Sequence, residues 1–422
     1  MTYKAPRGTR DVLPEESWKW QGLERAFRDT ADRFGYREIR LPVFEETELF
    51  ARGIGDATDI VRKEMYSFED RKGRSLTLRP EGTAGTVRAF IEHNMGRGAR
   101  LTKLYYFCPM FRYERPQAGR YRQFWQWGLE GIGSMSPAVD AEIIHFSVSL
   151  FEKLGLAGAT ARINSAGCPT CTPRYNDLLR QALREKLDGF CDDCHVRYER
   201  NPRRMFDCKN EHCLELLSDA PSIVESLCDE CSQHFSEVQA RLGKMSVSAS
   251  VDPSMARGLD YYTKTVFEVH HAGLGAQSAL CGGGRYDALV EELGGAPTPA
   301  CGVSGGVERA LIAVEEAGAK AGDEPRPDVY VVSMGEAADL VAAGIIARLR
   351  ESVSVETDYQ GRSIKAQMKE AGKLRAGHVV IIGEDEVARG VATVKDMDAR
   401  SQEELSLDSL ADRLAEKLAG RA

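Results

Sequence analysis

Apolar residues near the start of the chain recur at the spacing of a helix. Within "WKWQGLERAFRDTADRFGY", Leu23, Phe27 and Phe34 share one face with Thr30, which predicts a long amphipathic helix. The Pro/Glu/Glu/Ser run before it suits a helix N-terminus. The next stretch, "EIRLPVFEETELF", has the pattern of a short apolar strand and contains Pro42. Because proline is tolerated at a sheet edge but not in a central ladder, this strand should border an interface.

Further runs have the composition of strands, with few helices between most of them: 75–78, 104–111, 121–131, 161–165, 247–251 and 266–270. They predict one large antiparallel sheet. Residues from about 167 to 245 break the pattern, because they are helical in period and hold eight of the eleven cysteines. We therefore expect a helical, cysteine-rich insertion within a sheet domain that spans residues 1–322.

The periodicity changes again after the small, charged and proline-bearing linker "AGAKAGDEPRPD". Three short apolar strands follow, within "DVYVVSM", "VSVETDY" and "HVVIIGE", and helical stretches beginning near Glu336 and Ser363 separate them. Alternating strands and helices are typical of a mostly parallel sheet. Residues 327–422 are therefore expected to form a second, compact α/β domain.

Composition narrows the class of protein. A chain of 422 residues, 42% hydrophobic and 28% charged, is expected to form two or three globular domains. We find no apolar run long enough to span a bilayer and no apolar segment typical of a secretory signal, so we expect no membrane association and a cytoplasmic location. The cysteines should then be reduced or metal-bound. A net charge of −8 argues against a general nucleic-acid coat protein but leaves specific RNA binding open.

The stretch "FRYERPQAGRYRQFWQWGLE", residues 111–130, combines a hairpin pattern with many charges. Arg112 and Glu114 share a face of the outgoing strand, because side chains alternate. The return strand presents four residues on one face: Phe124, Gln126, Gly128 and Glu130. An aromatic ring, a glycine and arginine forks are suited to a nucleotide. A solvated face with surface ion pairs is the alternative, and composition alone does not decide between them.

Several stretches together resemble one enzyme family, in order along nearly the whole chain. They are "RGTRDVLP", "LTLRPEGTAGTVRA", "FRYERPQAGRYRQF", "RGLDYYTKTVFEV", "CGGGRYDAL" and "GVSGGVERAL". With these motifs the sequence is similar to histidyl-tRNA synthetases, which are class II aminoacyl-tRNA synthetases. The resemblance implies an α+β fold, in which a class II antiparallel-sheet catalytic domain with the helical insertion precedes a C-terminal α/β anticodon-binding domain.

The activity that the resemblance implies is ATP-dependent ligation of L-histidine to tRNA(His). It would pass through a histidyl-adenylate intermediate and release AMP and diphosphate, with Mg²⁺ accompanying ATP. The first helix and the strand with Pro42 correspond to class II motif 1, which implies a homodimer. The loop 115–119 would reach the acceptor end of the tRNA, and residues 327–422 would bind the anticodon.

The family motifs also imply roles for single residues. Arg112 and Arg257 would be catalytic: Arg112 would contact the α-phosphate and the histidine carboxylate, and Arg257 would lie by the α-phosphate, where other class II enzymes place a metal. Glu114 would read the adenine edge, while Arg120 and Arg309 would hold the outer phosphates. Without its flanking motif, Arg257 would be interpreted as a turn arginine before a strand.

Histidine recognition requires a donor and an acceptor together, because neutral imidazole presents both. The resemblance implies that Glu81 and Tyr262 face the ring. The residues that the resemblance implies for histidine binding are Glu81, Thr83, Arg112, Gln126, Glu130, Arg257, Tyr261 and Tyr262. Of these, Thr83, Gln126 and Glu130 would hold the α-ammonium group and its surroundings, and Tyr261 would line the pocket. "CGGGRYDALVEELGG" would close the pocket, with support from Arg285 and Tyr286, although three glycines before a helix usually indicate a tight turn.

Two other features carry expectations of their own. Arg362, Lys365 and Lys369 are expected on one helix of the C-terminal domain, where they would meet phosphate or only form a solvated face. Trp125 and Trp127 should point to the face opposite Gln126 and affect packing, not specificity.

The insertion contains four cysteine pairs: Cys168/Cys171, Cys191/Cys194, Cys208/Cys213 and Cys228/Cys231. Four such pairs match two Cys₄ zinc sites that would stabilise a domain with a thin core. Buried thiols at helix turns are the alternative, and the resemblance neither requires nor excludes zinc.

Two other classes of protein are the alternatives to a synthetase. A synthetase-like regulatory subunit that supports a histidine-biosynthetic phosphoribosyltransferase would generally lack the anticodon domain and parts of the motifs, all of which this chain keeps. A zinc-bearing RNA-binding protein without catalysis would leave the pocket residues unexplained.

Overall fold

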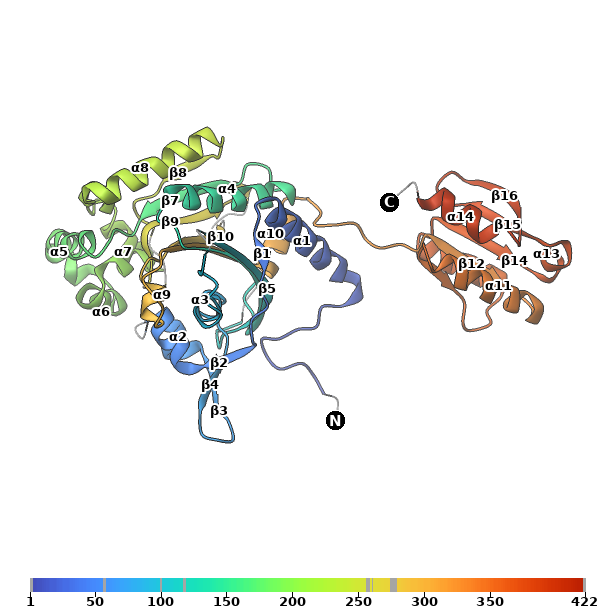
Figure 1. Cartoon of the computed structure of the whole chain (residues 1–422), viewed down its shortest axis with the longest axis horizontal. Helices are drawn as coiled ribbons and strands as arrows, with labels where there is room; N and C mark the ends of the chain where they lie inside the picture. The colour runs from blue at the N-terminus through green and yellow to red at the C-terminus, as the bar shows by residue number, and fades with distance from the viewer. Residues whose placement is uncertain are drawn as a thin grey trace. The chain divides into compact units, whose positions relative to one another are not determined.

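The computed structural model describes residues 3–55, 58–98, 101–116, 119–255, 259, 261–273 and 279–419. The chain divides into two compact units, Met1–Asp323 and Glu324–Ala422 (Figure 1). None of the helices in the described ranges is long and apolar enough to cross a membrane.

An eight-stranded sheet forms the centre of the first unit, in the order β1-β5-β6-β11-β10-β9-β7-β8. Its strands are β1 (Arg37–Glu38), β5 (Thr102–Phe111), β6 (Gln123–Ile132), β7 (Thr160–Ser165), β8 (Ala249–Val251), β9 (Thr263–His270), β10 (Ala279–Arg285) and β11 (Ala300–Gly306). The central pairs are antiparallel, as predicted. The two edges differ, because β1 pairs with β5 and β8 pairs with β7 in the parallel direction.

The predicted strand at 75–78 forms, but it does not belong to the large sheet. It is β4 (Ser75–Leu78), in a separate three-stranded sheet with β2 (Phe44–Glu46) and β3 (Tyr66–Glu69). The apolar stretch with Pro42 is likewise divided between β1 and β2. Arg79 explains the break, since its guanidinium donates hydrogen bonds to the carbonyl oxygens of Leu41 and Pro42 at 2.7 and 3.0 Å.

One face of the large sheet packs against α1 (Pro14–Arg33), α4 (Pro137–Lys153) and α10 (Val307–Glu316). The predicted first helix is confirmed, and Phe27 of its buried face lies 5.4 Å from the Trp127 ring, centroid to centroid. Trp127 is fully buried in this core and Trp125 packs at its margin, 6.4 Å from the Trp20 ring. Both tryptophans therefore have the packing role that alternation predicts.

The opposite face of the sheet is curved inward. Figure 1 shows α3 (Thr83–Glu92) inside this curve, while α4 and α1 lie on the outer side. The short helices α2 (Thr47–Ile54) and α9 (Leu289–Glu292) pack beside α3, and a one-turn π-helix, η1 (Ile60–Glu64), follows α2. Polar residues of the sheet thus face a partly enclosed space.

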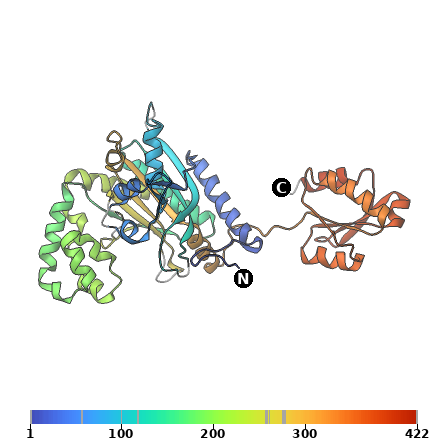
Figure 2. The same ribbon diagram turned by 90° about the horizontal axis from the view of Figure 1, so that it is seen from below.

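The cysteine-rich insertion lies between β7 and β8. Its elements are α5 (Cys171–Leu183), η2 (Arg184–Gly189), α6 (Asp192–Arg200), η3 (Pro202–Asp207), α7 (Glu211–Leu216), η4 (Ile223–Ser226) and α8 (Asp229–Lys244). Figure 2 shows it as a helical lobe at one side of the first unit. The lobe has a small core of its own, but Phe235, Val238 and Leu242 of α8 join the main core. The last helix of the insertion is therefore anchored on the sheet domain.

The second unit has a five-stranded sheet in the order β13-β12-β14-β15-β16. Its elements are β12 (Val329–Ser333), α11 (Glu336–Leu349), β13 (Val355–Thr357), α12 (Ile364–Lys373), β14 (His378–Ile382), α13 (Glu384–Arg389), β15 (Val391–Asp396), β16 (Ser401–Ser406) and α14 (Leu410–Ala419). The predicted strands, β12 to β14, are parallel, but β15 and β16 add two antiparallel pairings, so the sheet is mixed and not mostly parallel as expected. The prediction that Arg362 shares a helix with Lys365 and Lys369 is wrong, because Arg362 precedes α12 and its Nε donates a hydrogen bond to Asp358.

Candidate active site

The β5–β6 hairpin carries the nucleotide candidates at the end where β5 stops. Phe111 pairs with Gln123, and Arg112 follows immediately. The Nε of Arg112 donates a hydrogen bond of 2.8 Å to the carbonyl oxygen of Pro80. Its guanidinium carbon lies 5.3 Å from the centroid of the Phe124 ring. A backbone contact and a ring contact thus orient this guanidinium before any ligand binds.

A cavity of about 670 Å³ opens in front of this guanidinium. Five predicted site residues line it: Arg112, Glu114, Arg120, Gln126 and Arg309. Glu114 lies between two arginines, 3.9 Å from Arg112 and 3.7 Å from Arg120 by their closest charged atoms. The cavity volume is in the usual range for small-molecule sites. The four residues expected to hold ATP are therefore brought together on one cavity wall.

The lining of this cavity carries six basic and five acidic side chains, and three of the basic ones are the arginines of the sheet domain. Burial lowers the pKa of Arg309, at the start of α10, and the neighbouring guanidinium of Arg120 lowers it further. Like charges held near each other destabilise the charged forms until a counter-ion arrives. Arginine forks match phosphate oxygens with paired hydrogen bonds. The site therefore favours a polyanion of phosphate type.

A second group of polar residues lies deeper, around Glu130 in the middle of β6. The carboxylate of Glu130 accepts a hydrogen bond of 2.7 Å from the hydroxyl of Thr83 and another from the hydroxyl of Tyr286. Glu81 closes the N-terminus of α3, since its two oxygens accept from the backbone N–H groups of Thr83 and Ala84 at 2.6 and 2.9 Å. Three residues that were predicted to bind histidine, Glu81, Thr83 and Glu130, thus belong to one hydrogen-bonded cluster.

Burial changes the protonation of both carboxyl groups. It raises the pKa of Glu130 to about 8, although hydrogen bonds from Tyr286 and Thr83 oppose the shift. Burial also raises the pKa of Glu81 above its ordinary value. A buried carboxyl group with a raised pKa ionises readily when a cation binds beside it. The position of Glu130 therefore suits a cationic ligand group.

Aromatic side chains close the remaining sides of this cluster. The Tyr261 ring lies 4.8 Å from the Tyr262 ring and 5.5 Å from the Tyr286 ring, centroid to centroid. The amide nitrogen of Gln126 donates a hydrogen bond to the Ser304 hydroxyl at 3.3 Å. The amide oxygen of Gln126 is buried and has no hydrogen-bond partner among the described residues. An unpartnered buried acceptor at the border of the cavity indicates a place for a ligand donor.

The glycine run of "CGGGRYDAL" is a strand, so its interpretation as a tight turn is wrong. Gly282, Gly283 and Gly284 lie within β10 and pair with β9 and β11. A Cβ atom on Gly284 would lie 2.9 Å from the Tyr262 ring. Across the sheet, a Cβ atom on Gly302 would lie 1.9 Å from a carboxylate oxygen of Glu130. Glycine is needed here because pocket side chains cover the strands directly.

Arg285 and Tyr286, which were expected to support the pocket, lie on opposite faces of the sheet. Tyr286 donates to Glu130, whereas Arg285 is fully buried behind the sheet and bonds to Asp140 of α4. His234 of α8 lies 3.2 Å from the same carboxylate. Burial opposes the ionisation of Asp140, but hydrogen bonds from His234 and Arg285 lower its pKa below the ordinary value.

Sequence reasoning missed Asp140, His234, Ser304 and Tyr106. Tyr106 of β5 fills the space above Gly128, because a Cβ atom on that glycine would lie 2.3 Å from the Tyr106 ring. The Tyr106 ring, and not a bound ligand, therefore occupies the space that the missing side chain of Gly128 leaves. The alternation of side chains along β5 could have placed Tyr106 on the pocket face. The sequence around Asp140 and His234 contains no pattern that predicts their contacts with each other or with Arg285.

Some predicted residues lie outside the part of the chain that the structure describes. They are Arg257, expected beside the α-phosphate, and Gln117 and Ala118 of the loop expected to reach the acceptor end.

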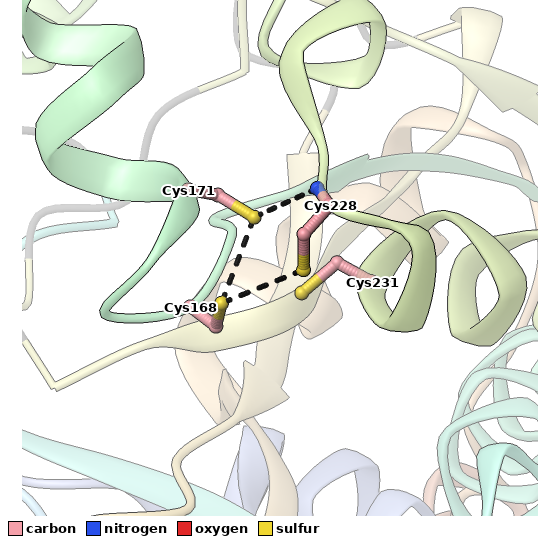
Figure 3. Close-up of side chains that lie close together, drawn as sticks. All are labelled: Cys168, Cys171, Cys228 and Cys231. Carbon is pink, nitrogen blue, oxygen red and sulfur yellow. Dashed lines mark hydrogen bonds between the residues drawn. The ribbon is translucent and has the colours of Figure 1, made fainter.

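The eight cysteines of the insertion gather in two groups that could each hold a metal ion. The outer tetrad consists of Cys168, Cys171, Cys228 and Cys231, and the inner tetrad consists of Cys191, Cys194, Cys208 and Cys213. Within each tetrad, the sulfur atoms all lie within 4.8 Å of one another. Figure 3 shows the first pair of the outer tetrad facing the second.

Comparisons with known proteins agree along the whole chain. A family model described as Histidyl-tRNA synthetase matches residues 8–186 and 204–310, and one described as Anticodon binding domain matches residues 328–417. The histidine–tRNA ligase of Acetivibrio thermocellus is 47% identical over 415 residues, which cover 98% of this chain and 100% of that protein. The histidine–tRNA ligase of Halothermothrix orenii is 49% identical, covering 98% of this chain and 99% of that protein.

A solved structure supports the same assignment. The apo histidyl-tRNA synthetase of S. aureus matches with a TM-score of 0.83 at 37% identity, covering 98% of this chain and 100% of that one. Sequence motifs, fold and full-length relatives all agree. The chain therefore belongs to the histidyl-tRNA synthetase family of class II aminoacyl-tRNA synthetases.

Proposed function

We propose that the two polar groups beneath the β5–β6 hairpin form one adenylate site, with ATP in the outer cavity and L-histidine around Glu130. Histidine–tRNA ligation is the activity of the family to which the chain belongs. The observation that carries the residue assignments is the single cavity lined by Arg112, Glu114, Arg120 and Arg309. These are the residues that the family motifs assign to ATP.

Arg112 is the central group of this proposal, because it lies between the two parts of the site. Its guanidinium would bind the α-phosphate and the histidine carboxylate together and neutralise charge as the carboxylate attacks phosphorus. Glu114 would accept from the adenine amino group, while Arg120 and Arg309 would hold the outer phosphates. Arg257 would assist at the α-phosphate, as its motif implies.

The deeper cluster would recognise histidine through hydrogen bonds to the polar atoms of the substrate. Glu81 and Tyr262 would pair with the two ring nitrogens, and an analogue lacking either nitrogen would leave a buried polar group unpaired, a penalty of about 10⁴-fold or more. Thr83, Gln126 and Glu130 would hold the α-ammonium group. The raised pKa of Glu130 supports this role, since the arriving cation would favour its ionised form.

The proposed ligase activity also implies which ions and which RNA the chain would bind. Mg²⁺ would accompany ATP, and structural Zn²⁺ would be confined to the insertion. The loop 115–119 would approach the acceptor end of tRNA(His), residues 327–422 would bind its anticodon, and the enzyme would act in the cytoplasm.

We propose a homodimer through the three-stranded sheet and the first helix. Val43, Phe44 and Phe68 are large apolar residues with 42, 50 and 44% of their surface exposed. The rings of Phe44 and Phe68 lie 6.2 Å apart, centroid to centroid, and form one apolar surface. Apolar patches of this kind mark protein interfaces.

Pyrophosphate exchange with each amino acid in turn tests the adenylate site without tRNA. Exchange is expected with histidine alone, and Arg112→Ala should abolish it while the chain stays folded. Arg241→Ala is the matched control, because Arg241 is an exposed arginine on α8 and does not line the cavity. Absence of exchange with histidine in the unmodified chain, or full exchange in Arg112→Ala, would contradict the proposal.

A further inference from the structure

The cysteine tetrads are nested and not consecutive along the chain. The outer tetrad joins the first and last cysteine pairs of the insertion, and the inner tetrad joins the two middle pairs. The outer tetrad therefore ties the segment that leaves β7 to the start of α8 (Figure 3), whereas the inner tetrad ties the start of α6 to the start of α7. Each of the eleven cysteines is a free thiol, and all of them lie in the described ranges.

Sulfur distances within the tetrads match tetrahedral metal coordination. Zinc–sulfur bonds of about 2.3 Å in a tetrahedron place the sulfur atoms about 3.8 Å apart. The Cys168 sulfur lies 3.6 Å from that of Cys171 and 3.8 Å from that of Cys228, and the Cys191 sulfur lies 3.7 Å from that of Cys208. A disulfide would need about 2.05 Å. Both tetrads thus leave room for an ion at their centres.

Backbone N–H groups also point at these sulfur atoms. The N–H of Cys228 donates to the sulfur of Cys171 at 3.1 Å, and the N–H of Cys191 donates to the sulfur of Cys213 at 3.4 Å. Such donors stabilise the negative charge of metal-bound thiolates and fix the ligand orientation. The same contact is made in both tetrads, although they are built from different segments.

The small core of the lobe gives a reason for metal binding. It contains eight large buried apolar or aromatic side chains, and its three other buried members, Cys194, Cys208 and Cys213, belong to the inner tetrad. Domains with so little core usually need a metal or disulfides to stay folded. The match to the family model omits residues 187–203, which include Cys191 and Cys194, so two of the four inner ligands lie outside that match.

We propose that the insertion binds two structural Zn²⁺ ions, one in each tetrad, and that the inner ion fixes one wall of the nucleotide cavity. Besides the arginines of the sheet domain, that cavity is lined by Arg204, Asp207, Cys208 and Lys209. Cys208 is an inner ligand and Lys209 is its direct neighbour. The inner ion thereby holds a lysine where the phosphates of ATP would lie, a consequence that rests on the proposed function.

Metal content tests the two sites without reference to activity. The unmodified chain, passed through a chelator column, should retain two zinc ions per chain; less than about 0.3 would overturn the proposal. Cobalt should replace zinc and give the visible absorption of tetrahedral cobalt thiolates. Cys281→Ala is the matched control, because Cys281 lies in the main core outside both tetrads, and it should retain both ions.

Fourfold serine variants test the nested arrangement. Replacing the outer tetrad should leave one zinc per chain, and replacing the inner tetrad should also leave one. A third variant, Cys168→Ser, Cys171→Ser, Cys191→Ser and Cys194→Ser, takes one pair from each tetrad and should leave none. Consecutive pairing predicts the reverse pattern, namely no zinc in the first two variants and one zinc in the third. That pattern would refute the nesting even if one variant proved unstable.

The link to ATP is tested by kinetics. Loss of the inner tetrad should raise the KM for ATP in pyrophosphate exchange about tenfold, the factor that one lost charge-assisted hydrogen bond costs. Lys209→Ala should raise it by a similar factor, and the combined variant should add little, because both changes remove the same contact. The exposed Lys244 gives the control, Lys244→Ala. An unchanged KM in Lys209→Ala would overturn the link, whereas absent exchange in the unmodified chain would instead refute the proposed function.

Discussion

Glu130→Gln removes the most strongly perturbed carboxyl group of the deeper pocket while keeping its shape. Glu130 has 1% of its surface exposed and accepts hydrogen bonds from Thr83 and Tyr286. Burial raises its pKa from 4.5 to about 8. The folded chain therefore keeps a proton on this group over a pH range in which the unfolded chain has already released it.

The size of the effect follows from linkage. A folded-state pKa above the unfolded value gives stability that is fully present below pH 4.5 and is lost as the pH rises towards about 8. Each pKa unit corresponds to about 1.36 kcal/mol, so the whole shift amounts to about 5 kcal/mol. Between about pH 5.5 and about pH 8.5 the unmodified chain should lose about 3 kcal/mol of unfolding free energy through this group, whereas the uncharged amide of the Glu130→Gln variant contributes no such loss.

Tryptophan fluorescence during urea unfolding measures this difference. All four tryptophans lie in the first unit, so the signal follows the unit that contains Glu130. The free energy of unfolding of Glu130→Gln minus that of the unmodified chain should rise by about 3 kcal/mol over the stated pH range. Glu316→Gln, at the exposed end of α10, is the control. A difference that does not change with pH would mean that Thr83 and Tyr286 keep Glu130 ionised, and would refute the reasoning.

Further substitutions test the support around the pocket. Gly302→Ala places a Cβ atom 1.9 Å from a Glu130 oxygen, so it should cost about 1–3 kcal/mol of unfolding free energy and abolish histidine-dependent exchange, with ATP binding retained in equilibrium dialysis. Asp140→Ala leaves the buried guanidinium of Arg285 without its carboxylate and should cost about 3–5 kcal/mol in urea unfolding. Phe44→Asp charges the exposed apolar surface and should separate the proposed dimer, so that light scattering gives half the mass of the unmodified chain.

The sequence predicts best where one period governs many residues. The amphipathic face of α1, the β5–β6 hairpin and the opposite directions of Trp127 and Gln126 all follow from local alternation or helical spacing. Such patterns depend only on burial of one face. Alternation therefore grouped the hairpin residues on one face before the fold was known, whereas their expected contacts with a nucleotide came from the family motifs.

Other features depend on contacts between distant segments, which local patterns do not contain. Ser75–Leu78 has the composition of any strand, and only the pairing with β2 and β3 assigns it to the small sheet. The glycines of β10 signal a turn when considered alone, because the atoms that exclude side chains there come from distant segments: the Tyr262 ring at Gly284 and the backbone of β11 at Gly283. The pairing of the tetrads is likewise a matter of folding, since cysteine spacing permits nested and consecutive arrangements equally.

Alternation also explains why the pocket and the core support each other. Along β6, Gln126 and Glu130 face the pocket, while Trp127 and Leu129 are buried against the helices on the other face. Arg285 at the end of β10 bonds to Asp140 behind the sheet, and the next residue, Tyr286, holds Glu130 in front. Because a one-residue slip would exchange the two faces, the register that buries the core is the register that assembles the site. The tryptophans and the Arg285–Asp140 pair therefore fix the strand positions on which the proposed site depends.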